Sequence, residues 1–138
     1  MNCDVGEGVG NEALIMPYIQ SCNIACGGHA GNEEIMNNVV KLALKHGVRI
    51  GAHPSYPDIE NFGRKRVKMN ATDLINSIRN QIEFLKEVVV ANKAKLHHIK
   101  AHGALYNDIA SDLKLAEVYL KAVSPYKGTL SLYVPYNS

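Results

Sequence analysis

Carboxylates and histidines recur beside glycines along this chain, and these residue types serve acid–base catalysis and metal binding. Asp4 and Glu7 lie near the N-terminus, whereas His29, His53 and His102 each follow a short apolar run. Imidazoles and carboxylates transfer protons near neutral pH and are common ligands of divalent metals. A single histidine is usually structural, but three at equivalent positions favour a shared site.

Two assignments of these groups remain open. In the first, Asp4, His29 and His53 bind a divalent metal that activates water. In the second, Asp4 and Glu7 act as acid and base while the histidines carry protons or bind substrate. The chain has no HExxH or CxxC spacing that would favour the metal. Solvated loop carboxylates are the plain alternative, although nearby glycines indicate close approach of the backbone to a ligand.

Lys100 is a further catalytic candidate because of its spacing from His102. The two residues are separated by one position, so strand alternation places both on one face. Lys100 would there balance negative charge or, with a depressed pKa, act as a nucleophile or base. An ion pair with Asp4 or Glu7 is the structural alternative.

Other polar residues are candidates for substrate binding, namely Asn23, Tyr106, Asn107 and Arg64. The amides and the tyrosine would orient a polar ligand or hold loops. Arg64 begins a short basic run that is suited to phosphate, with solvated surface charge as the alternative. His97 and His98 fall inside a predicted strand, so they are expected to point to opposite faces.

Composition excludes several classes of function. With a net charge of +2, the chain has no electrostatic case for nucleic acid or an anionic membrane, and no apolar run approaches the ~20 residues of a membrane span. The three cysteines argue against a disulfide framework, and the N-terminus lacks a signal-peptide pattern. A cytoplasmic protein with its cysteines in the core is therefore expected.

Apolar runs alternate with helical patterns along the chain. Strands are predicted at residues 2–5, 21–26, 48–52, 96–100 and 129–134. Helices are predicted from the cap Asn32 to His46, with Gly47 as the stop, over about 72–91, and from the cap Ser111 to about 123. Residues 53–70 form a long loop, of a kind that is usually functional or mobile.

Strands that alternate with helices predict an α/β fold with a parallel sheet and right-handed crossovers. We expect a single domain over residues 1–138 with about five βα units. Because a closed (β/α) barrel takes ~250 residues, this chain is expected to form only the N-terminal portion of a barrel. The chemical groups follow the strands, where ligands of such folds bind.

Several motifs together resemble the LamB/YcsF family over nearly the whole chain. The similarity is carried by five segments: NCDVGEG at residues 2–8, NIACGGHAG at 23–31, GAHPSYPD at 51–58, FGR at 62–64 and HGALYN at 102–107. The resemblance implies a barrel related to glycoside hydrolases and polysaccharide deacetylases. It also implies ATP-driven hydrolysis of 5-oxoproline to glutamate, together with two partner subunits.

The resemblance also implies the site residues. Its polar positions fall on Asp4, Glu7, Asn23, His29, His53, Lys100, His102 and Asn107. Two alternatives remain, a metal-dependent, deacetylase-like hydrolase of C–N bonds that needs no ATP, and a non-catalytic subunit that binds substrate or scaffolds its partners. A homo-oligomer is also left open.

Overall fold

Five parallel strands form one sheet, and they follow one another across it in chain order. The computed structural model describes residues 1–136. The strands are β1 (Asn2–Val5), β2 (Ser21–Ala25), β3 (Arg49–His53), β4 (Leu96–Lys100) and β5 (Ser131–Tyr133). A barrel wall has this sequential order, whereas a doubly wound sheet reverses its order at a switch point. The α/β fold of barrel type is therefore confirmed.

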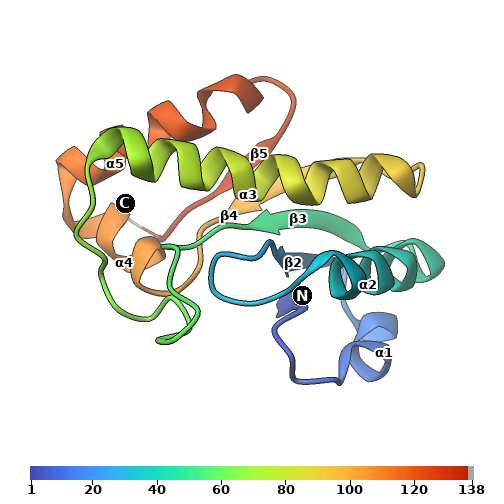
Figure 1. Cartoon of the computed structure of the whole chain (residues 1–138). Coiled ribbons are helices and arrows are strands. Elements are labelled where there is room, and N and C mark those ends of the chain that lie inside the picture. The colour runs from blue at the N-terminus through green and yellow to red at the C-terminus, as the bar shows by residue number, and fades with distance from the viewer. Residues whose placement is uncertain (137–138) are drawn as a thin grey trace.

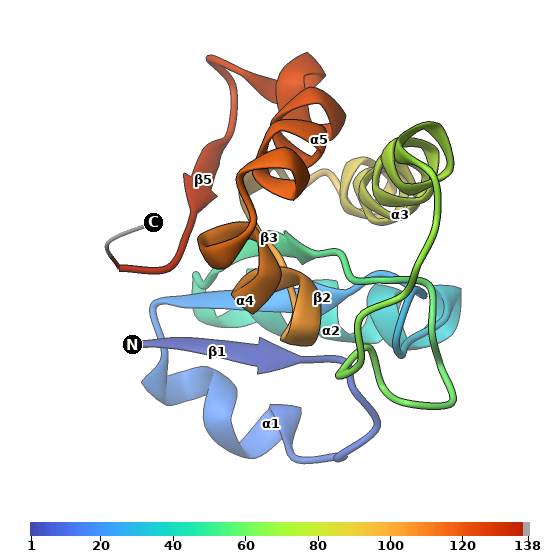
Figure 2. The same ribbon diagram turned by 90° about the vertical axis from the view of Figure 1, so that its left-hand side faces the viewer.

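The helices lie around the outside of the sheet in the same order as the strands (Figures 1 and 2). They are α1 (Glu12–Ile15), α2 (Glu33–His46), α3 (Ala71–Ala91), α4 (Gly103–Ser111) and α5 (Leu113–Val123), with 3-10 turns η1 (Met16–Tyr18) and η2 (Ser124–Tyr126). Helix α2 packs on α3, and α3 packs on α5. None of the helices within residues 1–136 is long and apolar enough to cross a membrane.

Local chemistry fixes the ends of the long helices. The Asn32 side chain accepts a hydrogen bond from the Ile35 amide, and Gly47 ends α2 with a left-handed φ of 64°. Asn70 caps α3 in the same way by accepting from the Asp73 amide. The predicted cap and stop of α2 are therefore confirmed.

The third predicted helix start is wrong. Ser111 ends α4, and Asp112 is the residue that caps α5, because its Oδ1 accepts from the Leu115 amide at 3.1 Å. Helix α4 itself is not among the predicted elements, because Gly103 and Ala104 follow His102 in a motif that is typical of a loop. Its buried residues Leu105 and Ile109 have the spacing of one helix face.

Strand alternation gives the sheet one apolar face. Ile24, Ile50 and Ile99 are buried on it and join the same core cluster as the apolar residues of α2, α3 and α5. Cys22 and Cys26 are also buried, and burial raises the pKa of each thiol to about 12. These two cysteines therefore belong to the core, as expected.

The opposite face of the sheet is polar and carries a row of residues in register. Asp4, Asn23, Gly51, His98 and Ser131 are successive neighbours across the five strands. Four of these five positions are polar. Because this face is turned away from the helices, the fold delivers polar groups to the inner side of the barrel wall.

The expectation that His97 and His98 point to opposite faces is wrong. The register between β3 and β4 shifts next to Gly51, which leaves one extra residue in β4. The two imidazoles contact each other, with their Nδ1 atoms 3.0 Å apart. A β-bulge breaks the two-residue alternation at this point.

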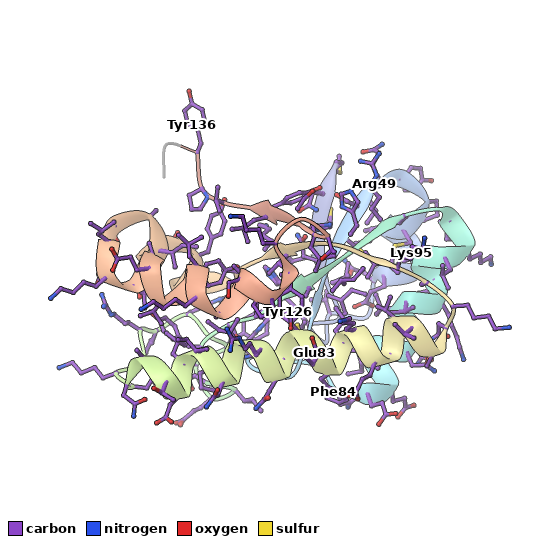
Figure 3. All side chains as sticks on the ribbon, turned by 90° about the horizontal axis from the view of Figure 1, so that it is seen from above. Arg49, Glu83, Phe84, Lys95, Tyr126 and Tyr136 are labelled. Carbon is purple, nitrogen blue, oxygen red and sulfur yellow. The ribbon has the colours of Figure 1, made fainter. Side chains whose placement is uncertain are left out.

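A side-chain hydrogen bond ties the C-terminal part of the described chain to α3. Tyr126 of η2 donates a hydrogen bond of 2.6 Å to Glu83 of α3, and Figure 3 shows these side chains facing each other. Tyr136 projects away from the ribbon and is 94% exposed. The η2 turn is thus anchored to α3, while the segment after β5 extends outward.

Candidate active site

The carboxyl ends of the first four strands bring one glutamate and three histidines together. Glu7 follows β1, His29 follows β2, His53 ends β3 and His102 follows β4. One ligand atom from each of the four side chains lies within 4.8 Å of all the others. We call this group the histidine cluster. It contains four residues that the sequence singled out, although their roles stay a prediction.

The Glu7 carboxylate is the common partner of the three rings. Its Oε1 lies 2.8 Å from His29 Nε2, 3.3 Å from His102 Nδ1 and 3.8 Å from His53 Nε2. Burial alone would raise the pKa of Glu7, but the His29 hydrogen bond and the nearby rings together lower it. The cluster therefore holds an ionised carboxylate among buried imidazoles.

Backbone carbonyls fix where two of the imidazoles carry their protons. His53 Nδ1 lies 2.7 Å from the Lys100 carbonyl oxygen, and His102 Nε2 lies 2.8 Å from the Phe62 carbonyl oxygen. A carbonyl only accepts, so the ring nitrogen that faces it must donate. In the neutral rings, the remaining nitrogens, His53 Nε2 and His102 Nδ1, are then bare acceptors only 3.1 Å apart.

The long loop after β3 supplies the Phe62 carbonyl by folding over the strand ends. Phe62 takes a left-handed φ of 55°, which is uncommon for a residue with a side chain. Its neighbour Gly63 has a φ of 65°, and a Cβ there would lie 3.0 Å from both His102 and His29. Gly63 also accepts a hydrogen bond from the Ala104 amide at the start of α4. The loop is thus tied to the site by its main chain.

His29 is the cluster member with an unsatisfied atom. Its ring stacks on His102, with centroids 3.5 Å apart and planes within 4°. Within residues 1–136, no hydrogen-bond partner is found for its buried Nδ1. Burial is also the main cause that lowers the pKa of His102 to about 4, with His29 next. Burial therefore favours the uncharged form of the His102 ring.

Asp4 lies beside the cluster and is held by three other side chains. Its Oδ1 lies 2.8 Å from Asn23 Nδ2, 3.2 Å from Lys100 Nζ and 3.4 Å from His53 Nε2. Burial opposes ionisation, but His53, Asn23 and Lys100 outweigh it and keep the pKa of Asp4 well below its usual range. The expected ion pair between Lys100 and Asp4 is therefore present, while a catalytic role of the lysine stays a prediction.

Behind Asp4 lies a chain of hydrogen bonds that the sequence did not reveal. His98 Nε2 donates to Asn23 Oδ1 at 2.6 Å, and Asn23 Nδ2 in turn donates to Asp4 and to Asn2 Oδ1. We call these four residues the Asn23 ladder. The available signal was Gly51, because a Cβ at this position would collide with the His98 ring. A glycine within a strand often marks such a close approach.

The remaining predicted residues lie around this centre. Tyr106 on α4 has its ring 5.6 Å from Lys100 Nζ, which links it to the Asp4 side of the site. Arg64 is exposed and stacks over the Phe62 ring at 5.0 Å. Asn107 is exposed on α4, and no contact of its side chain with the cluster is found within the described part of the chain. The structure thus brings Tyr106 closer to the chemistry than Arg64 or Asn107.

A family model and several curated relatives match this chain. The model of the LamB/YcsF family matches residues 1–138. A relative from Bacillus cytotoxicus, which bears the name of a 5-oxoprolinase subunit, is 43% identical over all of this chain and 57% of its own length. A relative of the same name from Shouchella clausii is 45% identical over 96% of this chain and 54% of its own. The chain therefore spans little more than half the length of these curated relatives.

Two solved structures extend the comparison. The lactam utilization protein from Thermus thermophilus is 34% identical and superposes with a TM-score of 0.95, over all of this chain and 58% of its own. A protein from Enterococcus faecalis with 16% identity and a TM-score of 0.62 covers 94% of this chain and 56% of its own, and shows the fold alone. The match of the family model over every residue settles the family. This chain belongs to the LamB/YcsF family.

Proposed function

We propose that this chain provides the reaction site for hydrolytic ring opening of 5-oxoproline to glutamate, within a multi-subunit 5-oxoprolinase. Support comes from the name of the relatives and from the T. thermophilus lactam utilization protein. The observation that carries the proposal is the placement of Asp4, which is ionised and lies between Lys100 and His53 at the strand ends. Carboxylate, ammonium and imidazole are the groups that amide hydrolysis needs.

Activation of the substrate comes first in the proposed reaction. A five-membered lactam is a stable amide, and its carbonyl carbon is a poor electrophile. Transfer of the γ-phosphoryl group of ATP to the lactam oxygen would release ADP and make the carbon electrophilic. ATP as co-substrate and the two partner subunits belong to this proposal.

Attack by water follows, and this chain supplies the groups around it. Asp4, held by Asn23 and Lys100, takes the proton of the attacking water as the general base. Lys100 balances the negative charge that develops on oxygen. The C–N bond then breaks, the ring nitrogen takes a proton to become the amine, and the acyl phosphate formed is hydrolysed by a second water to glutamate and phosphate.

A second candidate is a C–N hydrolase of deacetylase type that needs a metal and no ATP. The histidine cluster favours it, because four metal-ligating side chains converge there. Turnover that persists without ATP and depends on a divalent metal would select this candidate over the first.

The test is a single-turnover assay of the full-length protein assembled with its partner subunits. Asp4→Asn should lower the rate by about 10²- to 10⁴-fold, the usual contribution of a positioned acid or base. Asp73→Asn is the matched control, since Asp73 is exposed on α3. A near-normal rate for Asp4→Asn would remove the catalytic role. If no variant of the cluster slows turnover although substrate binds, the chain is a binding or scaffold subunit.

A further inference from the structure

We propose that the histidine cluster is a binding site for one divalent transition-metal ion of the zinc type. The donor atoms are His53 Nε2, His102 Nδ1 and a carboxylate oxygen of Glu7, with His29 Nε2 as the fourth. The proposal goes beyond the ring-opening reaction, because it concerns metal binding and not the identity of the substrate.

The spacing of the donor atoms suits one small ion. Zinc–nitrogen bonds of ~2.0–2.1 Å in a tetrahedron put neighbouring donors ~3.3 Å apart. Four of the six donor separations bracket this value: 2.8 Å for His29 to Glu7, 3.1 Å for His53 to His102, 3.3 Å for His102 to Glu7 and 3.8 Å for His53 to Glu7; all six lie within 4.8 Å. An ion bound by His53, His102 and Glu7 therefore needs only small shifts of the side chains, whereas ligation by His29 also requires its ring to tilt out of its stack on His102.

The proton positions of the neutral rings favour a cation between the inner atoms of the cluster. The carbonyls of Lys100 and Phe62 hold the ring protons of His53 and His102 on the outer nitrogens. The inner nitrogens then point lone pairs at each other across 3.1 Å, beside the Glu7 carboxylate. Three acceptors facing one another in a buried place repel, and a positive charge between them removes the repulsion.

The carbonyl contacts are also what metal-bound histidines usually show. A ligating imidazole almost always donates its second N–H to a carbonyl or carboxylate, which sets the ring orientation. His53 and His102 both have this partner. For His29, ligation requires that Nε2 exchange its hydrogen bond with Glu7 for the ion. The ring proton then moves to Nδ1, the atom without a partner.

The donor set selects the class of ion and excludes Asp4 as a ligand. Three imidazoles and one carboxylate suit zinc and its neighbours, whereas magnesium and calcium prefer oxygen donors. The Oδ1 of Asp4 already pairs with the Lys100 ammonium at 3.2 Å and the Asn23 amide at 2.8 Å. A second cation next to Lys100 would be repelled. Glu7 therefore takes the place that the sequence assigned to Asp4.

Metal binding to the full-length protein tests the proposal directly. Cobalt(II) serves as the probe because its visible absorption reports four-coordinate nitrogen and oxygen ligands, and zinc competition gives the affinity. We expect one ion per chain in the wild type. Changes to residues that only orient ligands already weaken metal binding ~10- to 100-fold, so His102→Ala and Glu7→Gln should each weaken it at least ~100-fold.

Two controls make the outcome specific. His46→Ala removes an exposed histidine at the end of α2 and should bind cobalt like the wild type. Asp4→Asn should also keep the ion while it loses turnover, which separates a failed metal site from a failed ring-opening function. Absence of stoichiometric binding, or equal binding by His102→Ala and wild type, overturns the proposal. If His102→Ala does not fold by circular dichroism, Glu7→Gln decides alone.

Discussion

The histidine cluster and the Asn23 ladder lie side by side on the polar face of the same sheet, yet they differ in how their protons are placed. In the ladder, each polar atom of Asn23 faces a complementary partner: its Oδ1 accepts from His98, and its Nδ2 donates to Asp4. In the cluster, bare nitrogens of His53 and His102 face each other. A satisfied buried network orients and rigidifies, whereas an unsatisfied one is where a ligand belongs.

Position along the strands accounts for this difference. The ladder residues lie within strands, where the register fixes which residues are neighbours and leaves no space for a ligand. The cluster residues lie at or just beyond the strand ends, where loops set the geometry. A single wall thus combines a rigid support with an adaptable binding rim, and Asp4 touches both.

Of the effects that test this difference between the ladder and the cluster, the largest is expected for His98. It should make the free energy of unfolding depend on pH. Burial, followed by the charge of His97, lowers the pKa of His98 from 6.5 to about 4. The unfolded chain therefore binds this proton first as the pH falls. The contribution of His98 is complete above pH 6.5, is lost as the pH falls toward 4, and amounts to no more than ~3 kcal/mol.

His98→Gln should flatten that dependence, because an amide keeps a donor toward Asn23 but does not titrate. Urea unfolding of the full-length protein at pH 4.5 and 7.5 measures it. Some slope should remain, since His102 has a pKa lowered in the same direction. His46→Gln is the exposed control. An unchanged slope in His98→Gln would show that the ladder tolerates a charged imidazole.

The next effect is steric. Gly51→Ala would push a Cβ into the His98 ring, because the two residues are direct neighbours across β3 and β4. Overpacking of this kind typically costs ~1–3 kcal/mol of unfolding free energy. Thermal unfolding of Gly51→Ala, His98→Ala and the double variant gives the coupling. The double variant should be more stable than the sum of the two changes predicts, and strict additivity would contradict the close packing of the ladder.

The smallest effect concerns Asp4, which contacts both the cluster and the ladder, and its ion-pair partner Lys100. Lys100→Met removes one of the groups that lower the pKa of Asp4, so this pKa should rise. The pair is partly exposed, and the loss of stability should stay near ~1 kcal/mol or below. Carboxyl-carbon NMR of Asp4 reads the titration, with Lys86→Met as the control. An unshifted Asp4 would mean that the ladder and His53 alone keep it ionised.

The sequence predicted the parts of this site that depend on local order. Apolar runs placed the five strands to within a few residues, and the parallel arrangement followed from the helices between them. Glu7, His29 and His102 lie close together because of that arrangement, since the carboxyl ends of parallel strands all lie at the same edge of the sheet. Asn32 and Gly47 likewise acted as local signals that the structure bears out.

Contacts that depend on register or on backbone path were beyond the sequence. The bulge that brings His97 onto His98 arises between two strands and has no local signature. The same holds for the Phe62 carbonyl, which reaches His102 from 40 residues away. The change from Asp4 to Glu7 among the proposed metal ligands has the same origin. Only the fold shows that the Asp4 carboxylate already pairs with Lys100.

The two carbonyls that orient His53 and His102 belong to the main chain of Lys100 and Phe62. Main-chain carbonyls are present whichever side chain stands at either position, so replacements that keep the left-handed backbone at residue 62 leave the imidazole tautomers intact. Only an insertion, a deletion or a rerouted loop 54–70 would reverse them. The length and path of this loop therefore set the tautomers of His53 and His102. Homologues with a different residue at position 62 should keep these tautomers as long as the turn keeps its backbone conformation.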